Sequence, residues 1–500
     1  MGNSGAKETT SGSSTPQYDV VIIGAGVVGN AIARELSRYA LRIAVVEKEL
    51  DVGMGTSARN SGVLHSGIHY KPGSLRAKLN VEGNSLMEGL CRELKVKIQY
   101  IGKLTVAAED EEMPTLHALK EQGEANGVPG LEILDPEDME KLQPGVRGLK
   151  ALFSPTTGII CPYTFTIALA ESALLNGVDY FLGEEVREVK RNGQKFTVRT
   201  RKGLGLVSKV LVNAAGVLSD KVCRMLGIND YTIYPCRGEY LVLDKRLGHH
   251  LSTLVYPAPH KGKAGLGIHL TKTVDGNILV GPSNEYVDGP EDWATTSYIM
   301  GKLREEGEKL LPSLTTSDII RSFSGIRAKQ APPEEGGFRD FVIESRTDVP
   351  GFVNLVGIES PGLTSSPAIA RMVRDMVSAL VPLREKPEFK PELDRMTGYF
   401  HELSAEEQAD LVAKDRDYGE IVCRCEQITR KEVLEAIENP LGVKSVTALK
   451  FRARVMMGRC QGGFCLPKIV RILQEDFGYR PEDFFLYREG SHLFTGRVRS

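Results

Sequence analysis

Three glycines in the spacing G-x-G-x-x-G constrain the fold of this chain more than any other feature. Gly24, Gly26 and Gly29 stand between an apolar, strand-like run at residues 18–23 and a run with helical spacing that begins at residue 27. Gly24 permits a tight turn, Gly26 lets the backbone approach a pyrophosphate, and Gly29 allows a helix to pack closely on a strand. The helix N-terminus then offers free N–H groups to phosphates. This order predicts a dinucleotide-binding, Rossmann-like domain of the α/β class.

A carboxylate at the end of the next strand-like run narrows the choice of dinucleotide. Glu47 closes residues 43–47, where it can accept hydrogen bonds from a ribose hydroxyl and disfavours a 2′-phosphate. NADP is therefore disfavoured, while NAD and FAD both remain. No second motif lies between a strand and a helix, because Gly265-Leu266-Gly267 precedes another strand-like run. We expect one bound dinucleotide.

The length and the pattern along the chain predict how the domains are arranged. The 500 residues suffice for about three domains. Strand and helix patterns alternate to about residue 385, and a stretch rich in proline and charge follows. We predict a disordered tail at 1–16, a large dinucleotide-binding domain at 17–385, a linker at 386–417, a small cysteine-containing domain at 418–475 and an extension at 476–500.

Charge and hydropathy exclude several classes of function. The 63 Lys and Arg nearly balance the 65 Asp and Glu, which argues against a nucleic-acid carrier. The first residues lack the apolar stretch of a signal peptide, and no run approaches the length of a membrane span. We therefore expect a cytoplasmic protein with no transmembrane segment, for which peripheral membrane contact stays open.

Three further segments make the resemblance to a known family specific. They are Arg59-Asn60-Ser61-Gly62-Val63-Leu64-His65-Ser66-Gly67, Val210-Leu211-Val212-Asn213-Ala214-Ala215-Gly216 and Gly357-Ile358-Glu359-Ser360-Pro361-Gly362-Leu363-Thr364-Ser365. Together with the first motif they resemble the glutathione-reductase-type FAD fold in its D-amino-acid-oxidase-like branch. Within that branch the chain is similar to the FAD-dependent glycerol-3-phosphate dehydrogenase and L-2-hydroxyglutarate dehydrogenase relatives.

The resemblance implies a cofactor and a set of residues around it. It implies FAD in an extended conformation, with an interleaved antiparallel sheet closing the substrate pocket over the flavin. The expected cofactor-binding residues are Gly24, Gly26, Gly29, Glu47, Arg59, Asn60, Ser61, Gly62, Leu64, Gly216, Gly357, Gly362, Leu363 and Thr364. In the last segment, Thr364 or Ser365 with Pro367 predicts the start of a helix. Such a helix N-terminus would stabilise negative charge on reduced flavin.

Candidates on the substrate side are one arginine and three histidines. Arg327 matches the position where the family places an arginine to hold an anionic substrate group. A surface arginine in an ion pair is the competing interpretation. His65, His69 and His269 are candidates for the pocket, and we favour His65 and His269 for the catalytic role. Alcohol oxidation needs a base for the hydroxyl proton, and a neutral imidazole suits that task.

Four of the eight cysteines form a group that predicts a metal centre. Cys423, Cys425, Cys460 and Cys465 lie close together in the sequence, and the others, Cys91, Cys161, Cys223 and Cys236, are scattered and expected to be buried. Four thiolates suit structural zinc, but C-x-C spacing fits the usual zinc knuckle poorly. The segment resembles the bacterioferritin-associated-ferredoxin-like domain, which implies a 2Fe-2S cluster. Zinc remains the less favoured alternative.

Taken together, these features predict an oxidoreductase that passes electrons from a substrate through FAD to the cluster. The leading hypothesis is oxidation of a small anionic secondary alcohol, sn-glycerol 3-phosphate to dihydroxyacetone phosphate, with a redox protein or sister subunit as acceptor. L-2-hydroxyglutarate is the alternative substrate. A function of another class also stays open, namely a flavin and iron–sulfur electron-transfer subunit without a substrate of its own.

Overall fold

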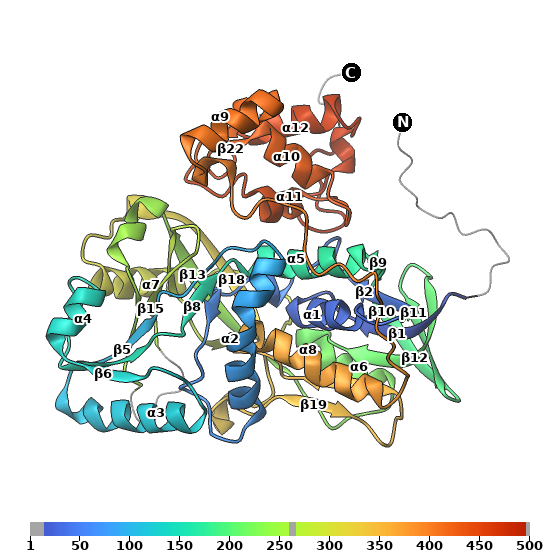
Figure 1. The fold of residues 1–500 in the computed structure, drawn as a ribbon, viewed down its shortest axis with the longest axis horizontal. Coiled ribbons are helices and arrows are strands. Elements are labelled where there is room, and N and C mark those ends of the chain that lie inside the picture. The colour runs from blue at the N-terminus through green and yellow to red at the C-terminus, as the bar shows by residue number, and fades with distance from the viewer. Residues whose placement is uncertain (1–14, 260–266, 497–500) are drawn as a thin grey trace.

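The computed structural model of the chain describes residues 15–259 and 267–496. The predicted tail at 1–16 therefore lies outside the described residues except for its last two positions, and so do Gly265 and Leu266. Two large sheets lie at opposite sides of the molecule, and the C-terminal elements form a further layer above them (Figure 1).

The first sheet has eight strands and contains the glycine motif. Its parallel centre runs in the order β9 (Asp179–Leu182), β2 (Ile43–Glu47), β1 (Gln17–Ile23), β12 (Gly205–Asn213) and β20 (Phe352–Val356). Antiparallel strands β10 (Val186–Asn192), β11 (Lys195–Thr200) and β19 (Val342–Ser345) complete it. The predicted strands and the parallel sheet are confirmed. The continuous apolar run of β1 follows from burial on both faces of a parallel sheet.

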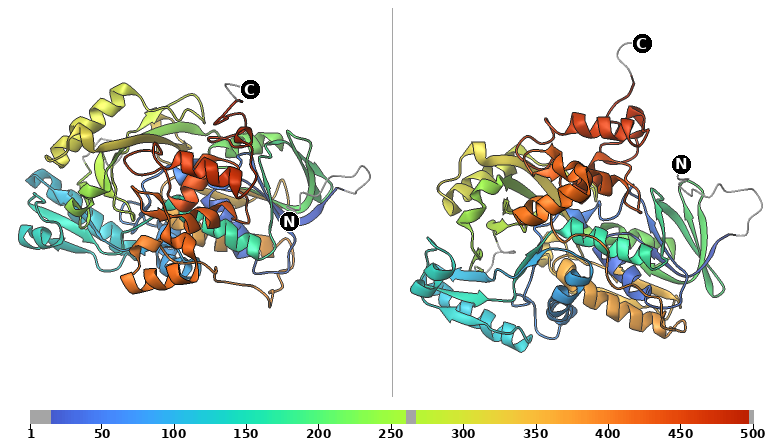
Figure 2. Two further views of the ribbon diagram at one scale, coloured as in Figure 1. Left: turned by 90° about the horizontal axis from the view of Figure 1, so that it is seen from above. Right: turned by 45° about the horizontal axis from the view of Figure 1, so that its top comes forward.

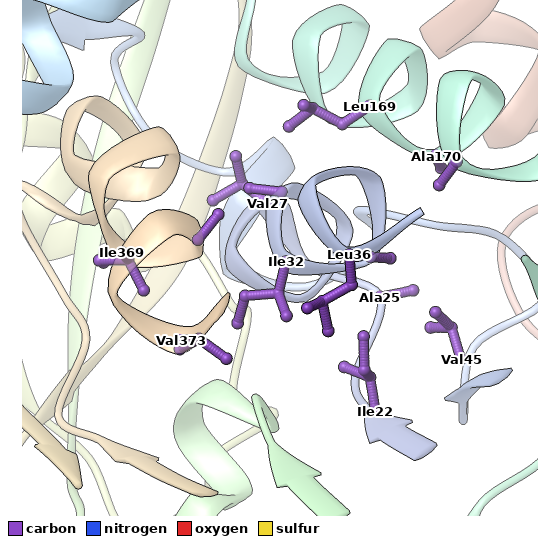
Figure 3. Packing of buried hydrophobic residues seen from close by; sticks show 14 of the residues in the cluster. Ile22, Ala25, Val27, Ile32, Leu36, Val45, Leu169, Ala170, Ile369 and Val373 are labelled. Atoms are coloured by element: carbon purple, nitrogen blue, oxygen red, sulfur yellow. The ribbon is translucent and has the colours of Figure 1, made fainter. Parts of the chain in front are cut away.

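Helix α1 (Val27–Leu36) lies at the centre of the main core. It packs between α8 (Gly362–Ser378) and α5 (Pro162–Leu175), with α2 (Leu75–Glu93) beyond α8. Figure 3 shows Ile32 and Leu36 of α1 between side chains of the neighbouring helices and those of the sheet below. Helix α8 begins at Gly362, two residues before the predicted start at Thr364.

The second sheet has nine strands and is built mainly from the middle of the chain. Along it lie β17 (Glu285–Tyr286), β13 (Tyr234–Leu243), β16 (Ile278–Gly281), β15 (His269–Lys272), β14 (Leu254–Pro257), β5 (Lys103–Ala107), β7 (Lys150–Ser154) and β6 (Glu132–Leu134), and β18 (Ile319–Lys329) pairs with β13. The pairing is antiparallel as expected, except that β14 and β5 run parallel. Helices α3 (Met113–Ala125), α4 (Pro136–Leu142) and α7 (Ser297–Leu310) accompany this sheet, and α6 (Ser219–Met225) belongs to the first.

A short three-stranded sheet and the C-terminal elements complete the fold. The short sheet pairs β3 (Val63–Leu64), β8 (Gly158–Ile160) and β4 (Ile98–Gln99). The C-terminal part comprises β21 (Ile421–Cys423), β22 (Ile428–Thr429), α10 (Arg430–Ile437), α11 (Val446–Ala453) and α12 (Leu466–Glu475), which share their own apolar core. The stretch predicted as a linker contains helix α9 (Ala405–Lys414), and Tyr399 packs against that core. The domain boundaries therefore remain predictions.

Buried ion pairs join the C-terminal part to both sheets. Arg452 pairs with Asp51, next to the first sheet, and Arg454 pairs with Glu426 of its own domain and with Asp275 of the second-sheet region. Nη2 of Arg454 also donates to Oδ1 of Asn277 over 2.7 Å. Figure 2 shows the orange and red C-terminal elements over the junction of the sheets. No described helix is both long and apolar enough to cross a membrane.

We expect the Arg454 cluster to contribute strongly to stability. Arg454→Met leaves Asp275 buried without its cation and leaves Glu426 with only the longer contact to Lys245, which should lower the free energy of unfolding by about 3 kcal/mol. Urea denaturation followed by the fluorescence of the single tryptophan, Trp293, measures this. The control is Arg480→Met, which breaks an exposed pair with Asp483 and should cost less than about 1 kcal/mol. Equal losses in the two variants would contradict the assignment.

Candidate functional site

One cavity of about 1020 Å³ extends from the glycine turn to the second sheet. It is large enough for an extended dinucleotide together with a small substrate. Of the predicted residues, those that line it are Gly26, Arg59, Asn60, Ser61, His65, His69, Gly216, His269, Arg327, Gly362, Leu363 and Thr364. Segments far apart in the sequence therefore meet at one site.

The glycine turn is closed so tightly that side chains cannot be accommodated. Gly24 has φ +104°, and a Cβ on it would lie 2.5 Å from the carbonyl oxygen of Ala214. A Cβ on Gly29 would lie 2.0 Å from the carbonyl oxygen of Gly24. These two glycines hold α1, β1 and β12 together, while Gly26 at the helix N-cap lines the cavity. The cradle fits a pyrophosphate that approaches the helix N-terminus.

Glu47 lies behind this turn rather than in the cavity wall. Its Oε2 accepts a hydrogen bond from the Ala25 N–H over 2.7 Å, and its Oε1 accepts one from the Glu49 N–H over 2.9 Å. Burial raises the pKa of this carboxyl group. The two backbone donors fix the carboxylate at the end of β2, with lone pairs left for a ribose hydroxyl.

The remaining predicted residues lie outside the cavity wall and pack against the segments that form it. A Cβ on Gly62 would lie 2.2 Å from the carbonyl oxygen of Ile160, and one on Gly357 would overlap the Gln330 side chain. Leu64 is fully buried in β3. These residues shape the segments that carry Asn60, Ser61 and Thr364 without facing the cavity themselves.

The N-terminus of α8 faces the cavity through Gly362, Leu363 and Thr364. The Thr364 hydroxyl accepts a hydrogen bond from the His65 N–H over 3.0 Å, which ties this helix start to the segment after β3. The first N–H groups of a helix carry partial positive charge. The site can therefore stabilise negative charge on a bound group.

Arg327 projects from β18 into the cavity with its charge unpaired. Its Nη2 donates to the carbonyl oxygen of Ser283 over 3.1 Å and its Nη1 to Oδ1 of Asn284 over 3.3 Å. Across the strand pair, a Cβ on Gly238 would lie 2.6 Å from Nη2, so glycine there makes room for the guanidinium. Within the described residues no carboxylate pairs with Arg327, which argues against the surface ion pair considered from the sequence.

The three histidines line the same end of the cavity and are held neutral. Burial lowers the pKa of His65 to about 3 and that of His269 to about 4, and it lowers the pKa of His69 well below the ordinary value. Nδ1 of His269 lies 2.9 Å from the carbonyl oxygen of Gly267, which can only accept. His269 therefore carries its proton on Nδ1 and keeps a free lone pair on Nε2.

Sequence reasoning missed several polar residues of the cavity wall. Glu359 pairs with both Arg76 and Lys329, and all three side chains are buried. The Ser57 hydroxyl accepts the Val27 N–H at the start of α1. Glu359 belongs to a segment that the sequence singled out, but no local pattern marks Arg76 or Lys329 as its partners.

The four C-terminal cysteines come together as two pairs. Direct interaction with Cys465 lowers the pKa of Cys423 to about 6 and raises that of Cys465, and Cys425 interacts with Cys460. Thr429 caps α10, and α12 begins directly after Cys465. In the described part of the chain, no three His, Cys, Asp or Glu side chains are placed to share one metal ion. Two thiolate pairs fit two irons of a cluster.

Contacts next to the cysteines lead back to the cavity. Oε1 of Gln461, the residue after Cys460, accepts a hydrogen bond from Nη1 of Arg321 over 2.9 Å. Arg321 lies on β18, the strand that carries Arg327. Farther along β18, a Cβ on Gly325 would lie 2.0 Å from the carbonyl oxygen of cavity-lining Arg59. One strand thus reaches from the cavity to the cysteine segment.

Comparison with known proteins decides the family. Residues 19–376 match the family described as FAD dependent oxidoreductase. The chain belongs to this family. Residues 421–475 match the BFD-like [2Fe-2S] binding domain. The cofactors of this FAD dependent oxidoreductase are thus FAD and a 2Fe-2S cluster, as predicted.

Several relatives resemble this FAD dependent oxidoreductase along most of its length. Glycerol 3-phosphate dehydrogenase of Caloramator mitchellensis is 41% identical over 97% of this chain and 99% of its own length. Mitochondrial L-2-hydroxyglutarate dehydrogenase of Homo sapiens is 33% identical over 73% of this chain and 89% of its own. The FAD-bound structure of L-alpha-glycerophosphate oxidase from Mycoplasma pneumoniae superposes with TM-score 0.70 and 31% identity, covering 76% of this chain and 99% of the other.

Loss of one cysteine should remove the cluster and leave the flavin. In Cys425→Ser, purified without oxygen, we expect iron to fall from about two per chain to nearly none, because one iron loses a thiolate. Flavin absorbance should not change, since the cysteines lie outside the cavity wall. Metal analysis and absorbance spectra measure both, and Cys91→Ala, at a buried single cysteine, is the control. Zinc in place of iron in the unmodified protein would contradict the prediction.

Proposed function

We propose that this protein oxidises sn-glycerol 3-phosphate to dihydroxyacetone phosphate. The observation that carries the proposal is the unpaired Arg327 guanidinium, which faces the cavity beside neutral histidines. The relative named glycerol 3-phosphate dehydrogenase supports the choice of substrate, because its similarity extends across both the oxidoreductase region and the cysteine domain.

The charge of the cavity wall suits a phosphate dianion. Around Arg327, the buried side chains Arg76 and Lys329 share the single carboxylate of Glu359. The inner wall therefore carries more positive than negative charge before a substrate enters. In our proposal Arg327 binds the phosphate with two N–H donors, a geometry in which guanidinium surpasses ammonium.

The chemistry requires a base beside the reacting hydroxyl. Oxidation of a secondary alcohol breaks the O–H and C–H bonds, releasing a proton to the base and a hydride from the carbon. We assign the base to His269, because its tautomer leaves the Nε2 lone pair free. His65, whose Nε2 lies 3.4 Å from the Ser360 hydroxyl, is the second candidate.

The proposed cofactor contacts follow the same surfaces. When bound, FAD would supply the acceptor for the hydride, and a 2Fe-2S cluster would supply one-electron transfer. We propose that Gly26 and Gly216 contact the pyrophosphate, Glu47 the ribose, and Thr364 with the α8 N-terminus the flavin ring. Cys423, Cys425, Cys460 and Cys465 are the proposed cluster ligands.

We propose that the final acceptor is a redox protein with an acidic surface. Beside Cys465, the Phe464 ring is 41% exposed, with the Arg424 guanidinium 4.3 Å and the Lys468 ammonium 5.6 Å from its centre. Neither cation forms an ion pair with a described residue. An exposed aromatic ring between two unpaired cations complements an acidic partner.

A substrate panel tests the proposed reaction. Anaerobic addition of sn-glycerol 3-phosphate should bleach the flavin absorbance, and Arg327→Met should raise the KM about a hundredfold, because a charge-assisted bidentate contact is lost. If only L-2-hydroxyglutarate bleaches the flavin, the alternative substrate, that of the relatives named L-2-hydroxyglutarate dehydrogenase, is favoured. Bleaching by neither compound would favour an electron-transfer subunit without its own substrate.

The pH profile and two variants test the base. With a pKa of about 4, His269 is deprotonated and competent at all pH values above about 5, so the acidic limb of the kcat/KM profile should appear only when the pH drops toward 4. His269→Asn should lower kcat at least about a hundredfold and remove this acidic limb. If His65→Asn does so and His269→Asn does not, the base is His65.

A further inference from the structure

Lys103 is a buried ammonium group without a carboxylate. It opens β5 and is among the largest fully buried side chains of the protein. Its Nζ lies 3.0 Å from Nε2 of His69 and 5.2 Å from the centre of the Tyr256 ring, and no described carboxylate pairs with it. Such an uncompensated charge costs folding free energy unless a partner neutralises it.

The sheet fixes Lys103 directly behind the cavity wall. Lys103 pairs in register with Leu254 of β14 on one side and Ser154 of β7 on the other. Tyr256, two residues along β14, lies on the same face as Leu254, and its ring centre lies 3.8 Å from that of His269 with the planes tilted by 34°. His69, Tyr256 and His269 line the cavity, whereas Lys103 does not. Its charge therefore reaches a ligand only through these neighbours.

The contact with Lys103 sets the tautomer of His69. An ammonium group has donors only, so Nε2 of His69 must accept and the His69 proton sits on Nδ1. Nδ1 has no partner among the described residues. His69 therefore offers an N–H donor, the opposite of His269, which keeps a free lone pair on Nε2.

We propose that Lys103 and His69 form a charge-backed hydrogen-bond donor for an anionic oxygen of the substrate. Lys103 donates to Nε2 of His69, and His69 donates from Nδ1 to the anion, so the buried positive charge is neutralised when the substrate binds. Lys103 is a positioning residue, since it acts through His69. The inference rests on the proposed class of anionic substrate but not on its identity.

The pair makes anion binding dependent on pH. Burial lowers the pKa of Lys103 to about 7. The titratable groups around it are His65, His69, His269 and Tyr256, and Arg327 is the other cation that acts on His269. His65 and His269 stay neutral above about pH 5, burial holds the pKa of His69 well below its ordinary value, and burial raises the pKa of Tyr256. Between pH 6 and 8.5, Lys103 is therefore the group of this set that changes charge.

Sulfate binding to the oxidised holoenzyme tests the pair without turnover. Sulfate stays a dianion across this range, so a change in its affinity reports the protein. Calorimetry should show tight binding below pH 7, where Lys103 is charged, and weaker binding above it. Lys103→Met should raise the Kd at pH 6 about tenfold and flatten the pH dependence, because the charged donor is lost. An unchanged Kd and pH profile would overturn the proposal.

Further variants separate this role from a purely structural one. Lys150→Met, at the exposed end of neighbouring β7, should leave the Kd unchanged. His69→Leu should match Lys103→Met, and the double variant should lose no more than either single one. His69→Asn, which keeps an acceptor and a donor, should retain part of the affinity. Additive losses in the double variant would contradict the proposal.

The experiments distinguish a failure of this inference from a failure of the variant to fold and from a failure of the proposed function. Methionine matches lysine in length and removes a buried charge, so Lys103→Met should melt no lower than the unmodified protein. If it fails to fold, His69→Leu provides the same sulfate measurement. Suppose that sulfate binding depends on Lys103 in a protein whose flavin is not bleached by glycerol 3-phosphate. That result would support this inference and reject the proposed substrate.

Discussion

The close approach of α1, β1 and β12 at the glycine turn is the constraint on which the rest of the site depends. No side chain fits at Gly24 or Gly29, because the carbonyl oxygens of Ala214 and Gly24 already occupy the space. That contact sets the distance between the helix N-terminus and the ends of the parallel strands. The same strand ends bring Gly216 and the segment after β20 to the cavity, so a looser turn would displace every surface that a dinucleotide contacts.

The end of the cavity next to the second sheet combines cationic side chains with neutral imidazoles. Arg327, the Arg76–Lys329–Glu359 cluster and Lys103 together leave unneutralised positive charge around a space of limited size. Burial and this field keep the histidines deprotonated, which is the state a base requires. An anion that enters the cavity lowers the electrostatic cost of the site while leaving the base free to act.

Much of the fold and part of the site could be predicted from the sequence, and the division has a physical cause. The glycine turn, the strands beside it and the start of α12 depend on neighbouring residues, so local spacing indicates them. Lys103 looks like an ordinary first residue of a strand, and only the tertiary structure places its ammonium group beside His69 and Tyr256. The pairing of Arg454 with Asp275 joins residues far apart in the chain, and no local pattern encodes it.

The fixed position of the cysteine domain gives the two cofactors a common framework. Arg452 and Arg454 attach this domain to both sheets with buried charges, so its displacement would break two buried ion pairs. From Gly325, beside Arg59, to Arg321, beside Gln461, β18 spans four residues, or about 13 Å at the usual rise of a strand. Since the same strand carries Arg327, the proposed substrate contact and the contact beside the cysteine segment belong to one continuous strand.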